Sequence, residues 1–139
     1  MIKELVRDDA ILSQTCEPAT ADDAALAQDL LDTMASIDDA VCLAANQIGV
    51  PKAVVVYKDD NDETHVMYNP KMLLGLGAFK CDEHCLSHDD AHKVTRFIKI
   101  KVSFDELVDG ALKQRRRDFT DWEAQMIQHM IDHCRGRLV

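Results

Sequence analysis

The chain lacks the features that mark membrane-spanning, secreted and repetitive proteins. No apolar run approaches the ~20 residues that a membrane-spanning helix needs. The amino-terminal stretch MIKELVRDDA has no apolar signal-peptide core, so we expect a cytoplasmic protein. No repeat or low-complexity tract interrupts the 139 residues, which predicts a single domain over residues 1–139.

Positive charge is also scarce. The chain has 16 Lys and Arg residues against 25 Asp and Glu residues, a formal net charge of −9. This balance argues against nucleic acid or an anionic membrane as a partner. The five cysteines are expected to be thiols or metal ligands, because disulfides are rare without export.

Hydrophobic spacing predicts a helix, several strands and a second helix. Residues 21–37 carry apolar side chains at helical spacing after Thr20. Residues 53–58 and 64–70 predict a hairpin, because β-branched runs flank a polar turn. In the strand predicted at 95–104, Phe97 shares a face with Lys99 and Lys101, while Ile98, Ile100 and Val102 share the other. Residues 111–119 are expected to be its antiparallel partner.

The last predicted helix begins at Thr120 and ends before Gly136. Thr120 and Glu123 have the spacing of a capping box, and Gly136 suits a left-handed cap. His129 and His133 lie on the same broad face as the apolar side chains of this helix. The order of elements predicts an α+β fold, with an antiparallel sheet packed around the carboxy-terminal helix.

The stretch QHMIDH, Gln128 to His133, places two histidines four positions apart. Their rings then project from one side of the helix about one turn apart, which suits two ligands of one metal ion. Two core histidines with hydrogen-bond partners are the alternative. A third ligand is available in Cys85, which lies in the polar stretch DEHCLSHDD. A closed zinc site of Cys81, Cys85 and nearby histidines would leave the helical pair without a third ligand.

Three short motifs, in order, resemble those of the peptide deformylases. AVCLAANQ (residues 40–47) is similar to G-φ-G-L-A-A-x-Q, EHCLS (83–87) to E-G-C-L-S, and QHMIDH (128–133) to Q-H-E-x-D-H. The similarity spans nearly the whole chain and is closest to the short bacterial form. It implies a deformylase fold, with the final helix carrying the metal ligands.

The resemblance implies that Cys85, His129 and His133 hold one divalent metal ion. The expected ion is Fe²⁺ in the cell, with Ni²⁺, Co²⁺ or Zn²⁺ also accepted. The metal lowers the pKa of a water in the fourth position, and that water attacks the formyl carbon of an N-formyl-methionyl peptide. Such a hydrolase acts in protein maturation, with ribosome-associated nascent chains as expected partners.

The resemblance also gives roles to residues around the metal. The side-chain amide of Gln47 and the backbone N–H of Leu86 would donate to the developing oxyanion. Glu83 and Arg96 are expected to pair near the site; two solvated surface charges are the alternative. Asp132 either orients a ligand histidine or lies at the surface.

The sequence departs from the family motifs at the residues closest to the chemistry. Met130 replaces the glutamate that serves as general acid and base, so weak or altered activity is expected. Ala40, Cys42 and His84 replace glycines, and Cys42, Leu43 and His84 are expected to line the substrate channel. We keep three further hypotheses. In the first, His84 takes over proton transfer, and in the second, Cys42 is a redox-sensitive thiol. In the third, the protein binds a metal or a peptide without catalysis.

Overall fold

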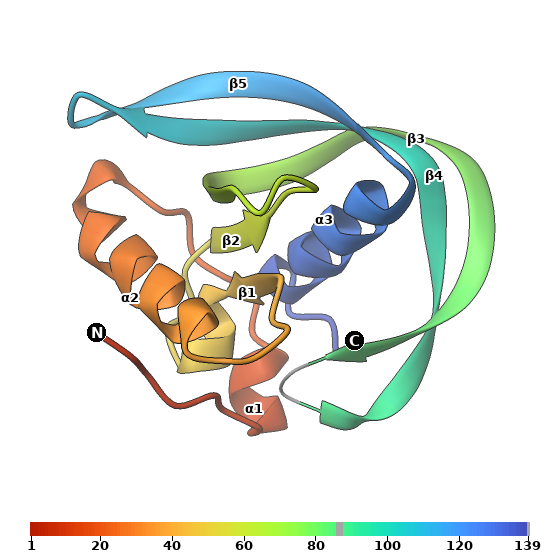
Figure 1. Ribbon diagram of the computed structural model, residues 1–139, viewed down its shortest axis with the longest axis horizontal. Coiled ribbons are helices and arrows are strands. Elements are labelled where there is room, and N and C mark those ends of the chain that lie inside the picture. The colour runs from red at the N-terminus through yellow and green to blue at the C-terminus, as the bar shows by residue number, and fades with distance from the viewer. Residues whose placement is uncertain (86–87, 139) are drawn as a thin grey trace.

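The computed structural model describes the backbone of residues 1–85 and 88–138 and, apart from residues 84–92, the side chains of that part. It has one antiparallel sheet in the order β1-β2-β3-β4-β5, with helices on both of its faces (Figure 1). The predicted α+β class is therefore confirmed. The elements are α1 (Asp9–Leu12), the 3₁₀ turn η1 (Ala21–Asp23), α2 (Ala24–Ala35), β1 (Cys42–Ala44), the 3₁₀ turn η2 (Ala45–Ile48), β2 (Val54–Lys58), β3 (Thr64–Cys85), β4 (His88–Val108), β5 (Ala111–Thr120) and α3 (Asp121–Cys134).

Strand β2 separates two hydrophobic clusters. Val54 and Val56 pack into the cluster that contains α2, whereas Val55 and Tyr57 pack into the cluster that contains α3. A strand buried on both faces needs an uninterrupted apolar run, which the sequence supplies as VVVY. The sheet therefore lies between α2 and α3.

Strands β3 and β4 form a long ribbon that curves around α3 (Figure 1). Ile100 and Val102 are buried, as their spacing predicts. Ile98 was predicted to share their face, and this is wrong: its side chain is 51% exposed, while Phe97 packs against the core. β4 pairs with β5 only from Lys99 onward, so at Phe97 and Ile98 the sheet consists of β3 and β4 alone. A two-stranded ribbon twists more strongly than a broad sheet, and this twist moves the two side chains out of strict alternation.

The two long helices begin differently. Thr20, which precedes the first predicted helix, forms a capping box with Asp23 at the start of η1, and this 3₁₀ turn leads into α2. Thr120 precedes α3 but its side chain makes no capping hydrogen bond, so the capping box predicted with Glu123 is wrong. Thr120 is still in extended conformation and paired with Lys99. None of the helices in the described part of the chain is long and apolar enough to cross a bilayer.

The end of α3 is fixed against the amino-terminal segment. Gly136 has a φ of 73°, and the backbone N–H of Arg137 donates to the carbonyl oxygen of Asp132 at 3.0 Å, so the predicted left-handed cap is confirmed. The backbone N–H of Cys16 donates to the carbonyl oxygen of Cys134 at 2.9 Å. These contacts set the position of the last turn of α3, which carries His133.

Candidate active site

Helix α3 brings His129 and His133 together inside the molecule. His129 is 7% exposed and His133 is 1% exposed, and their Nε2 atoms are 3.1 Å apart. The rings meet edge to face, with centroids 4.9 Å apart. Both nitrogens therefore face one point beside the helix, as their spacing predicts.

A buried chain of charges orients His129. The Nδ1–H of His129 donates to Glu83 at 2.8 Å, and Glu83 forms two further bonds with Arg96, at 2.6 and 2.9 Å. Arg96 also pairs with Asp132 at 2.6 Å. Because Nδ1 donates, the lone pair of a neutral His129 ring lies on Nε2, which faces His133.

Glu83 stays ionised in this setting. Burial alone would raise the pKa of its carboxyl group, but the hydrogen bonds and charges of His129 and Arg96 outweigh burial and lower the pKa to about 2. A permanent carboxylate at this position keeps the proton of His129 on Nδ1. The predicted pair of Glu83 and Arg96 is present and buried, and Asp132 contacts Arg96 instead of lying free at the surface.

The geometry of the two histidines fits a metal ion. Two imidazole nitrogens bound to one tetrahedral ion at roughly 2.0–2.1 Å lie about 3.3 Å apart, close to the observed separation. The carbonyl oxygen of His133 accepts from the side-chain amide of Asn46 at 2.9 Å, which ties the helix to η2. The third expected ligand is Cys85, whose backbone ends β3 two residues after Glu83 and pairs with His88. Its side chain lies outside the described residues.

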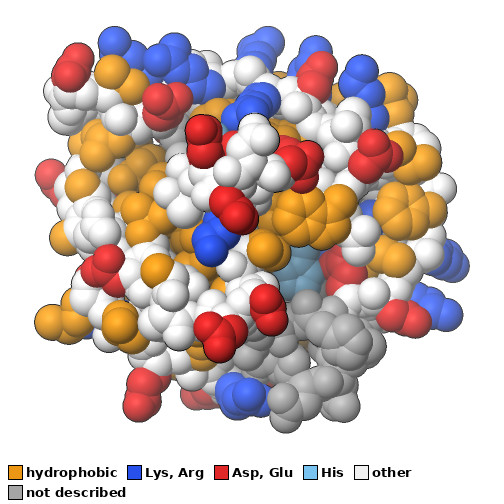
Figure 2. Space-filling model, in the orientation of Figure 1, with side chains coloured by type: hydrophobic (Ala, Val, Ile, Leu, Met, Phe, Trp, Pro, Cys, Tyr) orange, Lys and Arg blue, Asp and Glu red, His pale blue; other side chains and the backbone are white. Residues whose placement is uncertain are grey.

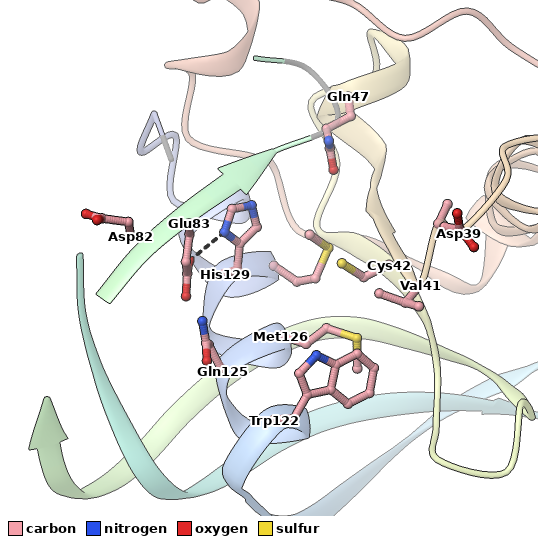
Figure 3. A pocket seen from close by; sticks show the side chains of 12 residues that line it. Asp39, Val41, Cys42, Gln47, Asp82, Glu83, Trp122, Gln125, Met126 and His129 are labelled. Carbon is pink, nitrogen blue, oxygen red and sulfur yellow. Dashed lines mark hydrogen bonds and ion pairs between the residues drawn. The ribbon is translucent and has the colours of Figure 1, made fainter. Parts of the chain in front are cut away.

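A cavity of about 370 Å³ lies beside His129 (Figure 3). Helix α3 forms one wall, β1 and the loop before it form a second, and the end of β3 forms a third. Apolar and sulfur-containing side chains make up much of its lining, among them Val41, Cys42, Met126 and Met130. Such a cavity suits a small ligand that carries apolar groups.

Of the residues expected to differ from the deformylase motifs, Ala40, Cys42 and Met130 line this cavity. Met130 is 1% exposed and lines the cavity next to His129. Cys42 is half-buried and also lines it, and neither Cys42 nor Ala40 has a positive φ, so neither position needs glycine for its backbone. Leu43 was expected to line the channel, but it is fully buried in the cluster that contains α2. Alternation along β1 turns it to the opposite face from Cys42.

Gln47 lies at the cavity with its amide group oriented. Its Oε1 accepts from the backbone N–H of Ala44 at 2.9 Å, so its Nε2 is the donor end of the side chain. The residue is almost completely buried in η2. Leu86, the other expected donor, and the side chain of His84 lie outside the described residues.

Sequence reasoning did not identify the rim of the cavity. Trp122, Asp39 and Asp82 line it, and all three are exposed. Helical spacing placed Trp122 on the same face as His129, which follows it by seven positions or about two helical turns, but did not show that it lines a cavity. Asp39 and Asp82 gave no such signal, since nothing in the sequence brings the loop before β1 close to β3.

A second group of potential metal ligands was also not predicted. Asp59, Glu63 and His65, at the turn between β2 and β3, have ligand atoms within 4.8 Å of one another. His65 Nε2 lies 2.7 Å from Asp59, and the His65 ring stacks on Tyr57. Because the Asp59 carboxylate also accepts backbone N–H groups of the turn, this group is accounted for as turn structure.

Comparison with known proteins gives the family. The model of the polypeptide deformylase family matches residues 2–139. The chain belongs to this family. The peptide deformylase of Clostridium beijerinckii is 35% identical over 140 residues, which cover all of both chains. Peptide deformylase 2 of Vibrio cholerae is 37% identical over 116 residues, 81% of this chain and 67% of that protein.

Solved deformylase structures share the fold. The crystal structure of a peptide deformylase from Legionella pneumophila superposes with a TM-score of 0.84 at 30% identity, covering 99% of this chain and 83% of that one. The peptide deformylase from Thermus thermophilus gives 0.85 at 27% identity, with the same coverage. The resemblance drawn from three short motifs is thus confirmed at the level of family and fold.

Proposed function

We propose that this protein is a metal-dependent deformylase that removes the formyl group from N-formyl-methionyl peptides, with activity weakened or altered by Met130. The observation that carries the proposal is the pair of buried Nε2 atoms, 3.1 Å apart, beside an apolar cavity. Family membership supports the reaction class. Nascent chains at the ribosome, in the cytoplasm, would be the source of such peptides.

His129 and His133, with Cys85, would hold one divalent ion, Fe²⁺ in the cell or Ni²⁺, Co²⁺ or Zn²⁺ in its place. When bound, the ion supplies Lewis-acid chemistry: it activates water and polarises the formyl carbonyl. Glu83 contributes by holding His129 in the tautomer that offers Nε2. Arg96 acts through Glu83, because it fixes the carboxylate of Glu83 in place, and Asp132 holds Arg96 from the other side.

The remaining steps depend on the residues of the cavity. The oxygen of water bonds to the formyl carbon, the carbon–nitrogen bond breaks, the nitrogen gains a proton, and formate and a free amine leave. The Nε2–H of Gln47 and the backbone N–H of Leu86 would donate to the carbonyl oxygen as negative charge builds on it. Val41, Cys42 and Met126 would surround the methionine side chain and exclude water.

Met130 cannot move the proton that this reaction requires. Its thioether has no acid–base function, and losing a positioned general acid and base typically reduces the rate roughly 10²- to 10⁴-fold. Transfer by His84 remains our alternative route, since imidazole titrates near neutral pH. The proposal is therefore a slow hydrolase in which the ligands are kept and proton transfer is impaired.

The test is a deformylation assay on formyl-Met-Ala-Ser with protein loaded anaerobically with iron or nickel. We expect Met130→Glu to raise kcat/KM by roughly 10²- to 10⁴-fold over wild type, because the side chain at 130 lines the cavity beside His129. Met130→Gln is the matched control, with the same shape and no acid–base function. Stoichiometric metal with no turnover above a Cys85→Ala control, in wild type and in Met130→Glu, would overturn the proposal.

Binding without hydrolysis is the second candidate function. It is favoured by the burial of Met130, which is 1% exposed and belongs to the core cluster around α3. A metal- or peptide-binding protein would keep Cys85, His129, His133 and the cavity without a general base. Saturable formyl-peptide binding, with no formate released by wild type or by Met130→Glu, would select this candidate.

A further inference from the structure

We propose that Cys16 and Cys134 form a redox modification site, where a hydroperoxide oxidises the two thiols to a disulfide that ties the amino-terminal segment to the end of α3. This inference does not depend on the proposed function, because neither cysteine is among the described residues that line the cavity. Cys134 directly follows His133, so the disulfide would form next to an expected metal ligand.

The backbones of the two cysteines are already paired. The N–H of Cys16 donates to the carbonyl oxygen of Cys134 at 2.9 Å, where the segment that follows α1 passes beside the end of α3 (Figure 1). A backbone hydrogen bond of this length places the two Cα atoms roughly 5–6 Å apart, and disulfides span about 4.4–6.8 Å. The two residues can therefore be bridged with little movement of either segment.

The two thiols are also in contact. The Sγ atom of Cys16 lies 4.0 Å from the carbonyl oxygen of His133, the residue before Cys134. A hydrogen bond between the thiols lowers the pKa of Cys16, against the effect of burial, and the same bond together with burial raises the pKa of Cys134. Both residues are reduced in the structure, so the contact is one between two thiols that can be oxidised together.

The two cysteines differ in exposure. Cys16 is half-buried, whereas Cys134, the last residue of α3, is 8% exposed. A small hydroperoxide therefore reaches the sulfur of Cys16 more easily than that of Cys134. Cys16 is the thiol that is oxidised first, and Cys134 is the thiol that then completes the disulfide.

The reaction balances with a hydroperoxide as the oxidant. The sulfur of Cys16 bonds to the outer peroxide oxygen, the O–O bond breaks, and the thiol proton leaves with the other oxygen as an alcohol or water. The sulfur of Cys134 then bonds to the sulfur of Cys16, the S–O bond breaks, and the hydroxyl leaves with the second thiol proton as water. The two sulfurs together lose two electrons, which the peroxide gains.

The disulfide would strengthen a contact that positions the last turn of α3. Gly136, two residues after Cys134, lies against the backbone of Ser13 and Gln14. A disulfide between the two cysteines closes a loop that contains most of the chain, and long closed loops restrict the unfolded chain strongly. Oxidation should therefore stabilise the fold and hold His133 in place.

The other cysteines have different surroundings. The Sγ atom of Cys81 lies 3.7 Å from the carboxylate of Glu83 and 3.6 Å from the side-chain amide of Gln125. Cys42 lines the cavity, and Figure 2 shows a histidine at the base of a hollow with hydrophobic atoms beside it. The side chain of Cys85 lies outside the described residues. Cys81 therefore supplies a control thiol away from the proposed pair.

The experiment treats the nickel-loaded protein with hydrogen peroxide, blocks the remaining thiols with N-ethylmaleimide and digests the protein on the amino side of aspartate. This cleavage places each of the five cysteines on a separate peptide, with Cys16 in residues 9–21 and Cys134 in residues 132–139. We expect mass spectrometry to find these two peptides joined, and dithiothreitol to separate them.

Oxidation should also raise the Tm by roughly 5–15 °C, the size typical of a disulfide that closes a long loop in a domain of this length. Dithiothreitol should reverse the rise. Cys16→Ser should abolish both the joined peptides and the rise, whereas Cys81→Ser, the matched control, should keep both. Oxidised and reduced wild type can be compared without any substitution, so the test stands even where a variant fails to fold.

Each outcome decides the inference. Joined peptides of Cys16 and Cys134 with a raised Tm support it. Five unlinked cysteines, a link from Cys16 to Cys42, or a link between two molecules overturns it, and so does the expected link with an unchanged Tm. None of these measurements depends on hydrolysis, so this inference and the deformylase proposal can fail independently.

Discussion

Glu83 is the residue on which the geometry of the candidate site depends most. Its carboxylate accepts from His129 and forms two bonds with Arg96, and it is buried together with both partners. The sequence predicted that Glu83 and Arg96 pair. It left the place of Asp132 open, because the spacing of two carboxylates along the chain does not tell which one reaches a given arginine.

Replacing Glu83 with glutamine should destabilise the protein strongly. The substitution leaves Arg96 buried with only Asp132 as a charged partner, and breaking a buried pair in this way typically costs about 3–5 kcal/mol. Glu106→Gln is the matched control, because Glu106 pairs with Arg115 at 3.5 Å on the exposed surface, where such pairs contribute about 0–1 kcal/mol. Urea unfolding of the metal-free proteins measures both. Equal losses in the two variants would contradict a structural role for the buried network.

At the scale of elements, α3 is positioned from both ends. Its start is held by the paired strand that ends at Thr120, and its end is held by Gly136 and the segment that precedes Cys16. Periodicity predicted the helix and its terminal glycine. The start was predicted with the wrong cap, because the pairing of Thr120 with Lys99 is a contact between distant parts of the chain.

Gly136→Ala should disturb this end of the helix. A Cβ at Gly136 would lie 2.5 Å from the carbonyl oxygen of Ser13 and 2.6 Å from the carbonyl carbon of Gln14, and the φ of 73° disfavours alanine as well. The matched control is Gly110→Ala, with a φ of 79° and no atom within 4 Å of the new Cβ. Gly110→Ala should lower the free energy of unfolding only by the cost of a left-handed backbone at alanine, about 1–2 kcal/mol.

We expect Gly136→Ala to lose clearly more stability than Gly110→Ala, and to weaken nickel binding as well, since the last turn of α3 carries His133. Thermal unfolding and metal titration provide the two measurements. A loss equal to that of Gly110→Ala, with unchanged nickel affinity, would show that contact with the amino-terminal segment does not position the helix.

At the scale of the whole molecule, two hydrophobic clusters meet at β2. Tyr57 is the residue of that strand whose pKa burial shifts. It lies against His65 and Phe119 and is 1% exposed. Burial raises its pKa to about 12, with Arg117 lowering it and Glu123 and Asp59 raising it by smaller amounts.

This shift predicts a loss of stability at alkaline pH. The unfolded chain ionises Tyr57 near pH 10, whereas the folded protein keeps the proton until about pH 12, so the folded state binds more protons in this interval. The stabilisation is complete below about pH 10 and is lost as the pH rises through about 12. Between about pH 9 and 11.5 the loss due to Tyr57 should be about 2 kcal/mol.

Comparing wild type with Tyr57→Phe isolates this contribution. The difference in unfolding free energy between the two proteins, measured by urea titration at each pH, should shift in favour of the variant as the pH rises. A difference that stays constant from about pH 9 to 11.5 would mean that the hydroxyl of Tyr57 is hydrated in the folded state.

The sequence by itself predicted the two long helices, parts of four strands, the family and most of the polar residues expected at the site. It did not predict α1, β1 or the course of β3 beyond residue 70. Helical spacing places His129, Met130 and His133 together, and three ordered motifs carry the resemblance to deformylases, because both depend on residues close together in the chain. These local features do not depend on how the sheet curves.

Only the tertiary structure decided which distant residues meet. It buried Leu43 on the far face of β1, exposed Ile98 where the β3–β4 ribbon twists, and brought Asp39 and Asp82 to one rim with Trp122. These outcomes depend on strand twist, register and the path of the loops, which arise from packing over the whole molecule and leave no periodic trace in the sequence.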